Sequence, residues 1–417
     1  MPTIAPVVLG ADLPVRLSDG TTVTYANLDY AATAPCLAAA ADAVNELLPW
    51  YASVHRGAGA ASRRCTLAYE QSRQTVADFL DIRPDDHVIF TRNTTDAMNL
   101  LARALPSHTT VVTWAGEHHA NLLPWPRVHC LPVPADLPAV VSGLTRALAD
   151  LRSAGPVLVA VTGASNVTGE VWPIAELAEI AHRHRARIAV DAAQLAPHRP
   201  VSMTDAGIDY LALSGHKLYA PFGAGVLAGR ADWLDAAAPY LAGGGATRHV
   251  GDEAAEVQWH VGPARHEAGT PNLLGAVALA AACATLAASP AVLAHEQDLL
   301  KRLRDGLAAL PGVAELRTFD VGHDRVGIVS FAVAEQRATE VAHRLAADHG
   351  IGVRDGLFCA HPLARKLLTD AAERLGCPTD RYAIRASIGI GTTVAHVDRL
   401  LRGLREIVTS SRAAARR

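Results

Sequence analysis

The sequence predicts an α/β protein: a large domain with a mainly parallel sheet covered by helices, followed by a smaller α+β domain at the C-terminal end. Three observations support this prediction. Short apolar runs alternate with helical patterns through the first two thirds of the chain, which favours a parallel sheet covered on both faces. Longer helical stretches begin near Ser289. The 417 residues, half of them hydrophobic, are enough for two domains with sizeable cores.

Each expected strand is an apolar run bounded by turn residues, and each expected helix shows the helical period. The large domain, residues 25–288, is expected to contain strands at 88–91, 110–114, 157–162, 187–190 and 210–214 and helices at 95–105 and 174–184. The small domain, residues 289–417, is expected to contain helices at 291–310 and 338–349 and strands at 327–333 and 386–390. We expect residues 1–24 to form an N-terminal segment that packs on the small domain.

The composition argues against several classes of protein. The formal net charge of -3 and the 19% of charged residues predict no nucleic-acid partner. The uncharged stretch 273–289 is short for a bilayer and is expected to be a buried helix, so we expect no membrane span. The six cysteines are widely spaced and lack zinc-site spacing, which predicts free thiols, no metal site and a reducing, cytoplasmic location. Residues 1–10 do not resemble a signal peptide, and residues 412–417 are expected to fray.

Two of the polar segments that follow expected strands carry ionisable side chains at the edge where α/β sheets bind ligands. Lys217 ends the tetrapeptide Ser-Gly-His-Lys after the strand 210–214. A desolvated lysine loses its proton more easily and becomes an amine nucleophile, although this one could also extend to solvent. Asp191 directly follows the strand 187–190, where a carboxylate can pair with the protonated ring nitrogen of a cofactor or simply cap a helix.

Three further segments follow strands in the same way. Thr94 and Thr95 lie between a strand and a helix, where they suit either a phosphate or a plain helix cap. His118 and His119 follow the strand 110–114, where one imidazole could stack on a flat ring or move a proton. A metal site is disfavoured, because adjacent side chains on an extended segment diverge. Asn166 can donate to a ring hydroxyl or belong to an ordinary turn.

With these five segments in this order, the chain resembles the fold-type I pyridoxal 5′-phosphate (PLP) enzymes of the class V aminotransferase group. Within that group it is most similar to the SufS-like cysteine desulfurases and selenocysteine lyases. The resemblance covers nearly the whole chain, from residues 28–33 to residues 385–387. Its most specific segments are 54–57, 118–121, 214–217 and 267–272.

The resemblance implies PLP as the cofactor and a role for each site residue. Lys217 would hold PLP as a Schiff base, Asp191 would pair with its pyridine nitrogen, and His118 would stack on the ring and move protons. Asn166 and Gln194 would contact the phenolic oxygen. The residues expected to hold the phosphate are Thr94, Thr95, Ser214 and His216, together with Thr270 of the neighbouring subunit in a homodimer with shared sites. The residues expected to bind a small amino-acid substrate are Arg385, which would hold its carboxylate, Arg354, His55 and Tyr30.

The choice of reaction depends on Cys359. In the SufS-like group a cysteine five residues after an arginine receives the sulfur, and Cys359 stands at that spacing from Arg354. The resemblance therefore implies removal of sulfur from L-cysteine, or of selenium from selenocysteine, to give alanine through a persulfide on Cys359 and, in turn, a sulfur-acceptor protein. The alternatives are a small apolar filler role for this cysteine, another PLP reaction (C–S lyase, epimerase or aminotransferase of a specialised pathway), or a silent relative that only binds.

Several residues depart from the pattern of the group. Tyr30 replaces a usual Asn, and Ala220 replaces a common Gly. Leu357 and Phe358 replace a pair of histidines that often precedes the cysteine. The segment between Cys359 and Arg385 is longer than usual, and we expect residues 366–381 to form a longer lid. These departures concern the substrate pocket more than the cofactor.

Overall fold

The computed structural model describes residues 6–151, 155–253 and 256–415. Its largest sheet has seven strands in the order β4-β10-β9-β8-β7-β5-β6. Only β10 runs against its neighbours, so the predicted α/β class with a mainly parallel sheet is confirmed. The strands are β4 (Asp86–Thr91), β5 (Thr110–Trp114), β6 (Val128–Leu131), β7 (Val157–Thr162), β8 (Arg187–Asp191), β9 (Tyr210–Ser214) and β10 (Gly225–Arg230).

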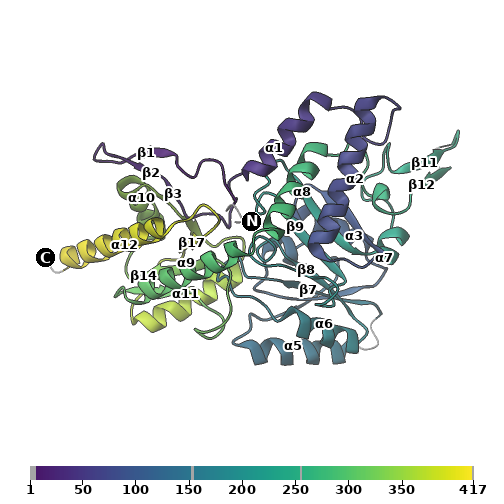
Figure 1. Cartoon of the computed structure of the whole chain (residues 1–417). Helices are drawn as coiled ribbons and strands as arrows, with labels where there is room; N and C mark the ends of the chain where they lie inside the picture. The colour runs from purple at the N-terminus through teal and green to yellow at the C-terminus, as the bar shows by residue number, and fades with distance from the viewer. Residues whose placement is uncertain (1–5, 152–154, 254–255, 416–417) are drawn as a thin grey trace.

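Alternate residues of the central strands enter two different cores, because side chains of a strand point to opposite faces. In β7, Val159 and Val161 pack in one core, whereas Leu158 and Ala160 pack in the other. The first core is covered by α1 (Ala38–Leu47), α2 (Ala60–Leu80), α5 (Leu137–Asp150), α6 (Ile174–Arg183) and α8 (Leu273–Ala287). The second is covered by α3 (Thr94–Ala104) and α7 (Ala231–Ala236) (Figure 1).

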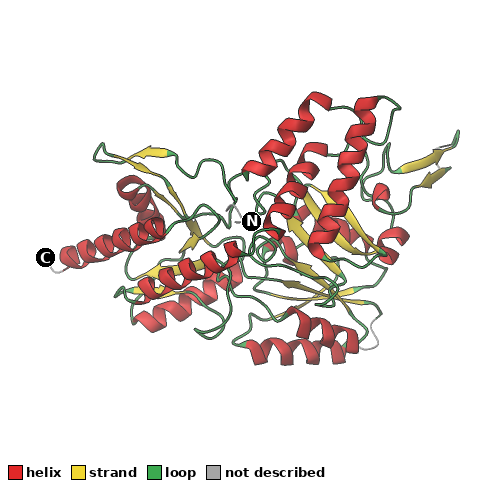
Figure 2. Cartoon of the chain, viewed as in Figure 1, coloured by secondary structure: helices red, strands yellow, loops and turns green. Residues whose placement is uncertain are grey.

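The C-terminal part is built on a second, antiparallel sheet with the order β13-β14-β17-β16. Its strands are β13 (Val313–Glu315), β14 (Ile328–Val333), β16 (Arg354–Gly356) and β17 (Ala383–Ser387). Its helices are α9 (Ala291–Ala308), α10 (Ala338–His349), α11 (His361–Leu375) and α12 (Val394–Ala415), which gather to the left in Figure 2. The last strand begins and ends three residues earlier than predicted, because Ile388 leaves it to bond Gly327 and the chain then turns around Tyr30.

The N-terminal residues contact this C-terminal part. β1 (Pro14–Arg16) pairs with β2 (Thr22–Thr24), and β3 (Ala26–Asn27) pairs in parallel with β15 (Ile351–Gly352). Ser18 donates its amide to the carbonyl of Ala347 at 2.8 Å, and Leu28 packs in the small-domain core. These contacts support the expected packing of the N-terminal segment; the domain limits themselves stay a prediction.

Two expectations about single segments have clear outcomes. Residues 366–375 belong to α11, whose Leu367, Leu368 and Ala371 are buried, so the expected lid over 366–381 is wrong for most of its length. The apolar residues of α11 recur on one face of the helix, and this face packs on the small domain. Within the described residues, no single helix is long and apolar enough to cross a membrane; α8 and α9, bent by 79° at their junction, pass as a pair by length and composition only. Residues 1–5 and 416–417, on which the leader and fraying expectations partly rest, lie outside the described residues.

The remaining elements are short. They are η1 (Leu48–Trp50), α4 (His119–Leu122), η2 (Pro263–Arg265) and the hairpin of β11 (Thr247–Val250) and β12 (Val257–Trp259). In Figure 1 this hairpin extends away from the body of the large domain, next to α2 and α7.

Candidate active site

Lys217 lies in the turn that follows β9. Burial lowers the pKa of its amine below the ordinary value, and the nearby Arg385 lowers it further, against the opposing effect of the Asp191 carboxylate. The side chain makes no hydrogen bond or ion pair with the residues that the structure describes. The backbone of the turn is tight, since a Cβ at Gly215 would stand 2.7 Å from the carbonyl oxygen of Ala224. The result is a deep, easily deprotonated amine that is free to form a covalent bond.

Asp191 is the last residue of β8 and is 5% exposed. Its Oδ1 accepts a hydrogen bond from the amide of Ala193 at 3.0 Å, and no other described group donates to the carboxyl. Burial raises the pKa of this carboxyl, while Lys217 opposes the rise. A buried carboxylate with a single hydrogen bond is costly unless a cation meets it. The ring nitrogen of PLP is such a cation, and together with the free amine of Lys217 these residues fit the cofactor.

The N-terminus of α3 is joined to the end of β9. The amide of Thr94 donates to the hydroxyl of Ser214 at 2.8 Å, and the two hydroxyls lie 2.8 Å apart. A Cβ at Gly225 would stand 2.5 Å from the Cα of Asn93, so only glycine lets β10 approach this turn. Free amides at a helix N-terminus attract phosphate. Thr94 and Ser214 are thus brought together at this N-terminus, and their binding of a phosphate stays a prediction.

The other expected phosphate residues are placed less directly. Thr95 is exposed on the first turn of α3. The imidazole Nδ1 of His216 lies 3.0 Å from the hydroxyl of Thr33, and burial lowers its pKa, with Lys217 adding to the effect. Gln194, which is expected at the phenolic oxygen and not at the phosphate, donates from its amide nitrogen to the carbonyl of Ala31 at 2.8 Å.

His118 caps the short helix α4. Its Nδ1 accepts from the amide of Ala120 at 3.1 Å, so the neutral ring carries its proton on Nε2. Burial lowers the pKa of His118 to about 3, helped by the nearby Lys217. The imidazole is therefore neutral at working pH and can stack on a ring or pass a proton through Nε2. The ring of His119 instead lies 4.6 Å from that of His361.

Glu117 anchors the turn that carries His118, a role that sequence reasoning missed. Its carboxyl is 1% exposed and accepts from the amide of Thr162 and from the side chain of Asn121, both at 2.9 Å. Burial raises its pKa to about 8, and the charge of Asp191 adds to the rise. The sequence did contain a sign of this role: Glu117 directly precedes the two histidines, in a segment expected to lie beside the neighbouring strand.

Arg385, on β17, brings the small domain into the site. It is 3% exposed; its Nη1 donates to the carbonyl of Asn166 at 3.0 Å and its Nη2 to Asp29 at 3.2 Å. Its buried Nε has no partner among the described residues. An arginine with an unmet donor beside Lys217 suits a substrate carboxylate.

Cys359 lies in the loop between β16 and α11, with its side chain exposed. Both Phe358 and Cys359 have left-handed backbones, with φ of 52° and 53°. Each such non-glycine residue costs about 1–2 kcal/mol, so the loop must be held by its surroundings. The side-chain amide of Asn166 donates to the carbonyl of Phe358 at 2.6 Å, and the amide of His119 donates to that of Cys359 at 2.8 Å. Cys359 lies close enough to interact electrostatically with both Lys217 and Arg385, which puts the thiol within the same site.

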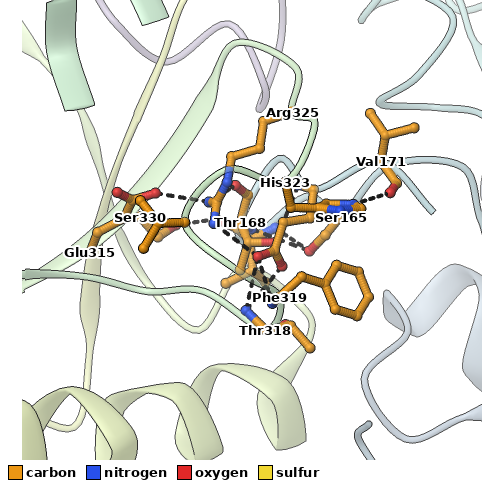
Figure 3. A network of polar contacts seen from close by, with 12 residues as sticks. Ser165, Thr168, Val171, Glu315, Thr318, Phe319, His323, Arg325 and Ser330 are labelled. Carbon is orange, nitrogen blue, oxygen red and sulfur yellow. Dashed lines mark hydrogen bonds and ion pairs between the residues drawn. The ribbon is translucent and has the colours of Figure 1, made fainter. Parts of the chain in front are cut away.

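The loop that carries Asn166 is fixed by the buried polar network of Figure 3. Arg325, 2% exposed, donates to the carbonyl of Thr168 and to Glu170, both at 2.8 Å, and pairs with Glu315 at 2.9 Å. Glu170 also accepts from the amides of Thr318 and Phe319. The segment between β7 and α6 is thereby tied to the small domain, next to Arg385.

Four predicted site residues are not brought to Lys217 within one chain. His55 bonds Glu70 at 2.7 Å and lines a separate cavity of about 570 Å³. Gly269 and Pro271, the two chain neighbours of Thr270, line the same cavity. Arg354 lies on the surface, 3.9 Å from Asp29. Tyr30 was expected to bind the substrate, but it is 5% exposed and packs against Tyr219 and the turn at Gly389 and Gly391. Almost none of its surface is left for a substrate.

The fold and the lysine–aspartate pair define a PLP enzyme of fold type I, and the comparisons agree. Residues 26–400 match the family described as aminotransferase class V, so the chain belongs to this family, whose members are PLP-dependent enzymes. A cysteine desulfurase of Klebsiella pneumoniae is 34% identical over 95% of this chain and 97% of its own. A probable cysteine desulfurase of Pseudomonas aeruginosa is 38% identical over 85% and 88%.

Solved structures give the same result. The apo cysteine desulfurase of Thermococcus onnurineus superposes with a TM-score of 0.80 and 31% identity, covering 93% of this chain and 95% of that one. The cysteine desulfurase CsdA of Escherichia coli, in an S-sulfonic acid form, has a TM-score of 0.77 and 31% identity, covering 92% and 94%. Among the described residues, no cluster of three or more histidine, cysteine, aspartate or glutamate side chains could hold a metal ion.

Proposed function

We propose that this enzyme is a cysteine desulfurase, which removes sulfur from L-cysteine to give alanine and leaves the sulfur as a persulfide on Cys359. The observation that carries the proposal is the bonding of the Cys359 loop to Asn166 and His119, beside the free amine of Lys217. Relatives named as cysteine desulfurases, at 34–38% identity over most of the chain, support the same reaction.

In this proposal the chain's residues divide the work. When bound to Lys217, PLP supplies the aldehyde that joins the substrate amine and the ring that takes up the electron pair of a breaking bond. Arg385 binds the substrate carboxylate, and His118 packs on the cofactor ring. The neutral amine of Lys217 removes the Cα proton.

The sulfur step uses the thiolate of Cys359. Its Sγ forms a bond to the substrate sulfur as the Cβ–S bond breaks, and the Cβ carbon keeps the electron pair of that bond. Protons returned by His118 Nε2 and Lys217 then give alanine. Cysteine and the Cys359 thiol are thereby converted to alanine and the Cys359 persulfide, with no outside oxidant or reductant. A thiol reductant or a sulfur-acceptor protein then removes the outer sulfur.

A single-turnover assay with L-cysteine tests the reaction. We expect one alanine and one persulfide per subunit, and we expect Cys359→Ala to lose sulfur release while it keeps the absorbance of bound PLP. Cys377→Ala, which changes a partly exposed cysteine beyond α11, is the matched control and should behave as wild type. Pyruvate and ammonia as products, or full sulfur release by Cys359→Ala, would show that another reaction of the family takes place. Turnover of selenocysteine against cysteine decides between the two elements.

Two further parts of the proposal concern assembly and location. A homodimer is supported by the exposed Thr270 beside the cavity lined by His55, since neither residue meets Lys217 of its own chain. Sedimentation should give twice the chain mass, and Thr270→Val should weaken PLP binding without changing that mass; a monomer with full PLP affinity would refute this. The six cysteines of the described residues are unpaired, which supports a cytoplasmic location.

A further inference from the structure

Phe358 lies between the substrate-binding residue Arg385 and the sulfur-accepting residue Cys359. The guanidinium of Arg385 lies over the Phe358 ring, 4.9 Å from its centroid. The carbonyl of Phe358 accepts the 2.6 Å hydrogen bond from Asn166, whose own carbonyl accepts from Arg385 at 3.0 Å. Ring, carbonyl and guanidinium therefore form a closed set of contacts next to the reactive thiol.

The backbone shows why this contact matters. Two successive residues in the left-handed region, Phe358 and Cys359, would leave it if nothing held them, because side chains other than glycine are crowded there. The hydrogen bonds to Asn166 and to the amide of His119 hold the two carbonyls. The ring of Phe358 is the one side chain of the pair that is held, since it also packs against the apolar cluster of Leu363 and Leu367.

We infer that Phe358 is a positioning residue for sulfur transfer: its ring, stacked on Arg385, fixes the Cys359 thiol relative to the substrate whose carboxylate the same arginine binds. The inference rests on the proposed desulfurase reaction. A cation that lies over an aromatic ring is attracted to the ring face, and this attraction is stronger where water is excluded. The guanidinium of Arg385 is buried, so it meets that condition.

Three variants of the holoenzyme separate the ring from simple apolar packing. Phe358→Tyr keeps an aromatic face, and Phe358→Leu keeps apolar volume without one. Leu375→Ala is the matched control, because Leu375 is equally half-buried against the same cluster but lies at the opposite end of α11 from Cys359. Bound PLP absorbance first checks that each variant is folded.

The first readout is the alkylation of Cys359 by iodoacetamide, followed by mass spectrometry of the peptide that contains it. The second is the separation of kcat and KM for L-cysteine. We expect Phe358→Leu to change the alkylation rate and to lower kcat by about 3- to 30-fold, the range of one cation–π contact, with KM nearly unchanged. Phe358→Tyr should restore both values, and Leu375→Ala should stay within about twofold of wild type.

The inference is overturned if Phe358→Leu equals wild type in both readouts, or if Leu375→Ala changes them as much. The alkylation readout needs no turnover, so it tests the position of the thiol even where the reaction assignment fails. Loss of the desulfurase assignment would instead appear as full sulfur release by Cys359→Ala, with the effect of Phe358 on alkylation still present.

Discussion

The buried carboxyl of Glu117 makes a prediction about stability and pH. Its folded-state pKa is about 8 against an ordinary value of 4.5, because burial disfavours the charge and Asp191 repels it. The folded protein therefore keeps this proton up to about pH 8, whereas the unfolded chain releases it near 4.5. Stability must fall as pH rises through this window, since the unfolded state there binds fewer protons than the folded state.

The size of the effect follows from the shift. At 1.36 kcal/mol per pKa unit, Glu117 costs the fold about 3 kcal/mol at pH 7, and the cost grows by about 2 kcal/mol between pH 6 and pH 8. Glu117→Gln removes the charge and keeps the shape. The new amide nitrogen replaces the oxygen that accepts from Asn121 Nδ2, so Asn121 must flip its amide; its Oδ1, which has no partner among the described residues, then accepts from the glutamine, whose oxygen still accepts from Thr162. We expect the variant to be more stable than wild type at pH 8.

Urea unfolding at pH 6, 7 and 8, at one protein concentration, measures the effect. The difference between Glu117→Gln and wild type should grow across this range. Glu179→Gln, on the exposed face of α6, is the control and should leave the slope unchanged. The other groups that act on Glu117 electrostatically are Asp191 and Cys130. Parallel pH profiles for wild type and Glu117→Gln would refute the assigned protonation state.

Three other substitutions test the frame of the site. Arg325→Met leaves the buried Glu170 without its cation, while Glu315 keeps Arg304 at 3.0 Å; the change should cost about 3–5 kcal/mol in urea unfolding, against about 0–1 kcal/mol for Arg302→Met in an exposed pair. Gly225→Ala forces the start of α3 away from Ser214, and a strain of about 1–3 kcal/mol should weaken PLP binding about tenfold or more, as followed by absorbance after dialysis; Gly322→Ala, in open space, should not. Arg385→Lys loses one charge-assisted hydrogen bond of about 1.5–3 kcal/mol and should raise KM for cysteine about 10- to 100-fold, whereas an unchanged KM would remove the arginine from the substrate.

Five strands of the large sheet could be predicted from the sequence because their apolar runs are bounded by turn residues. All five are present within two residues of their predicted ends. Two strands of this sheet were not predicted. β10 is buried, but its apolar run is only three residues between two glycines, and β6 is an exposed edge strand with the sequence Val-His-Cys-Leu. β17 was placed three residues late, because its apolar run continues through Ile388 and Ile390 beyond the last sheet pairing at Ser387.

The site divides in the same way. Residues that follow parallel strands were grouped by topology alone, since the ends of these strands share one edge; Lys217, Asp191 and Asn166 are examples. Arg385 and Cys359 come from the small domain, and only the family resemblance linked them to this edge. The contacts of Phe358 could not be predicted, because they depend on how the two sheets are placed relative to each other.

That relative placement is the reason for the buried charges at the domain junction. Apolar packing is non-directional and tolerates small shifts, whereas a network of directional hydrogen bonds has one good arrangement. The network around Arg325 (Figure 3) fixes the loop of Asn166. Asn166 in turn contacts both Arg385 and the Phe358 carbonyl. Transfer of sulfur requires the thiol, the substrate carboxylate site and the amine of Lys217 to hold one geometry within a fraction of an ångström. A junction of directional hydrogen bonds meets that requirement where an apolar one of equal area would leave the domains free to shift.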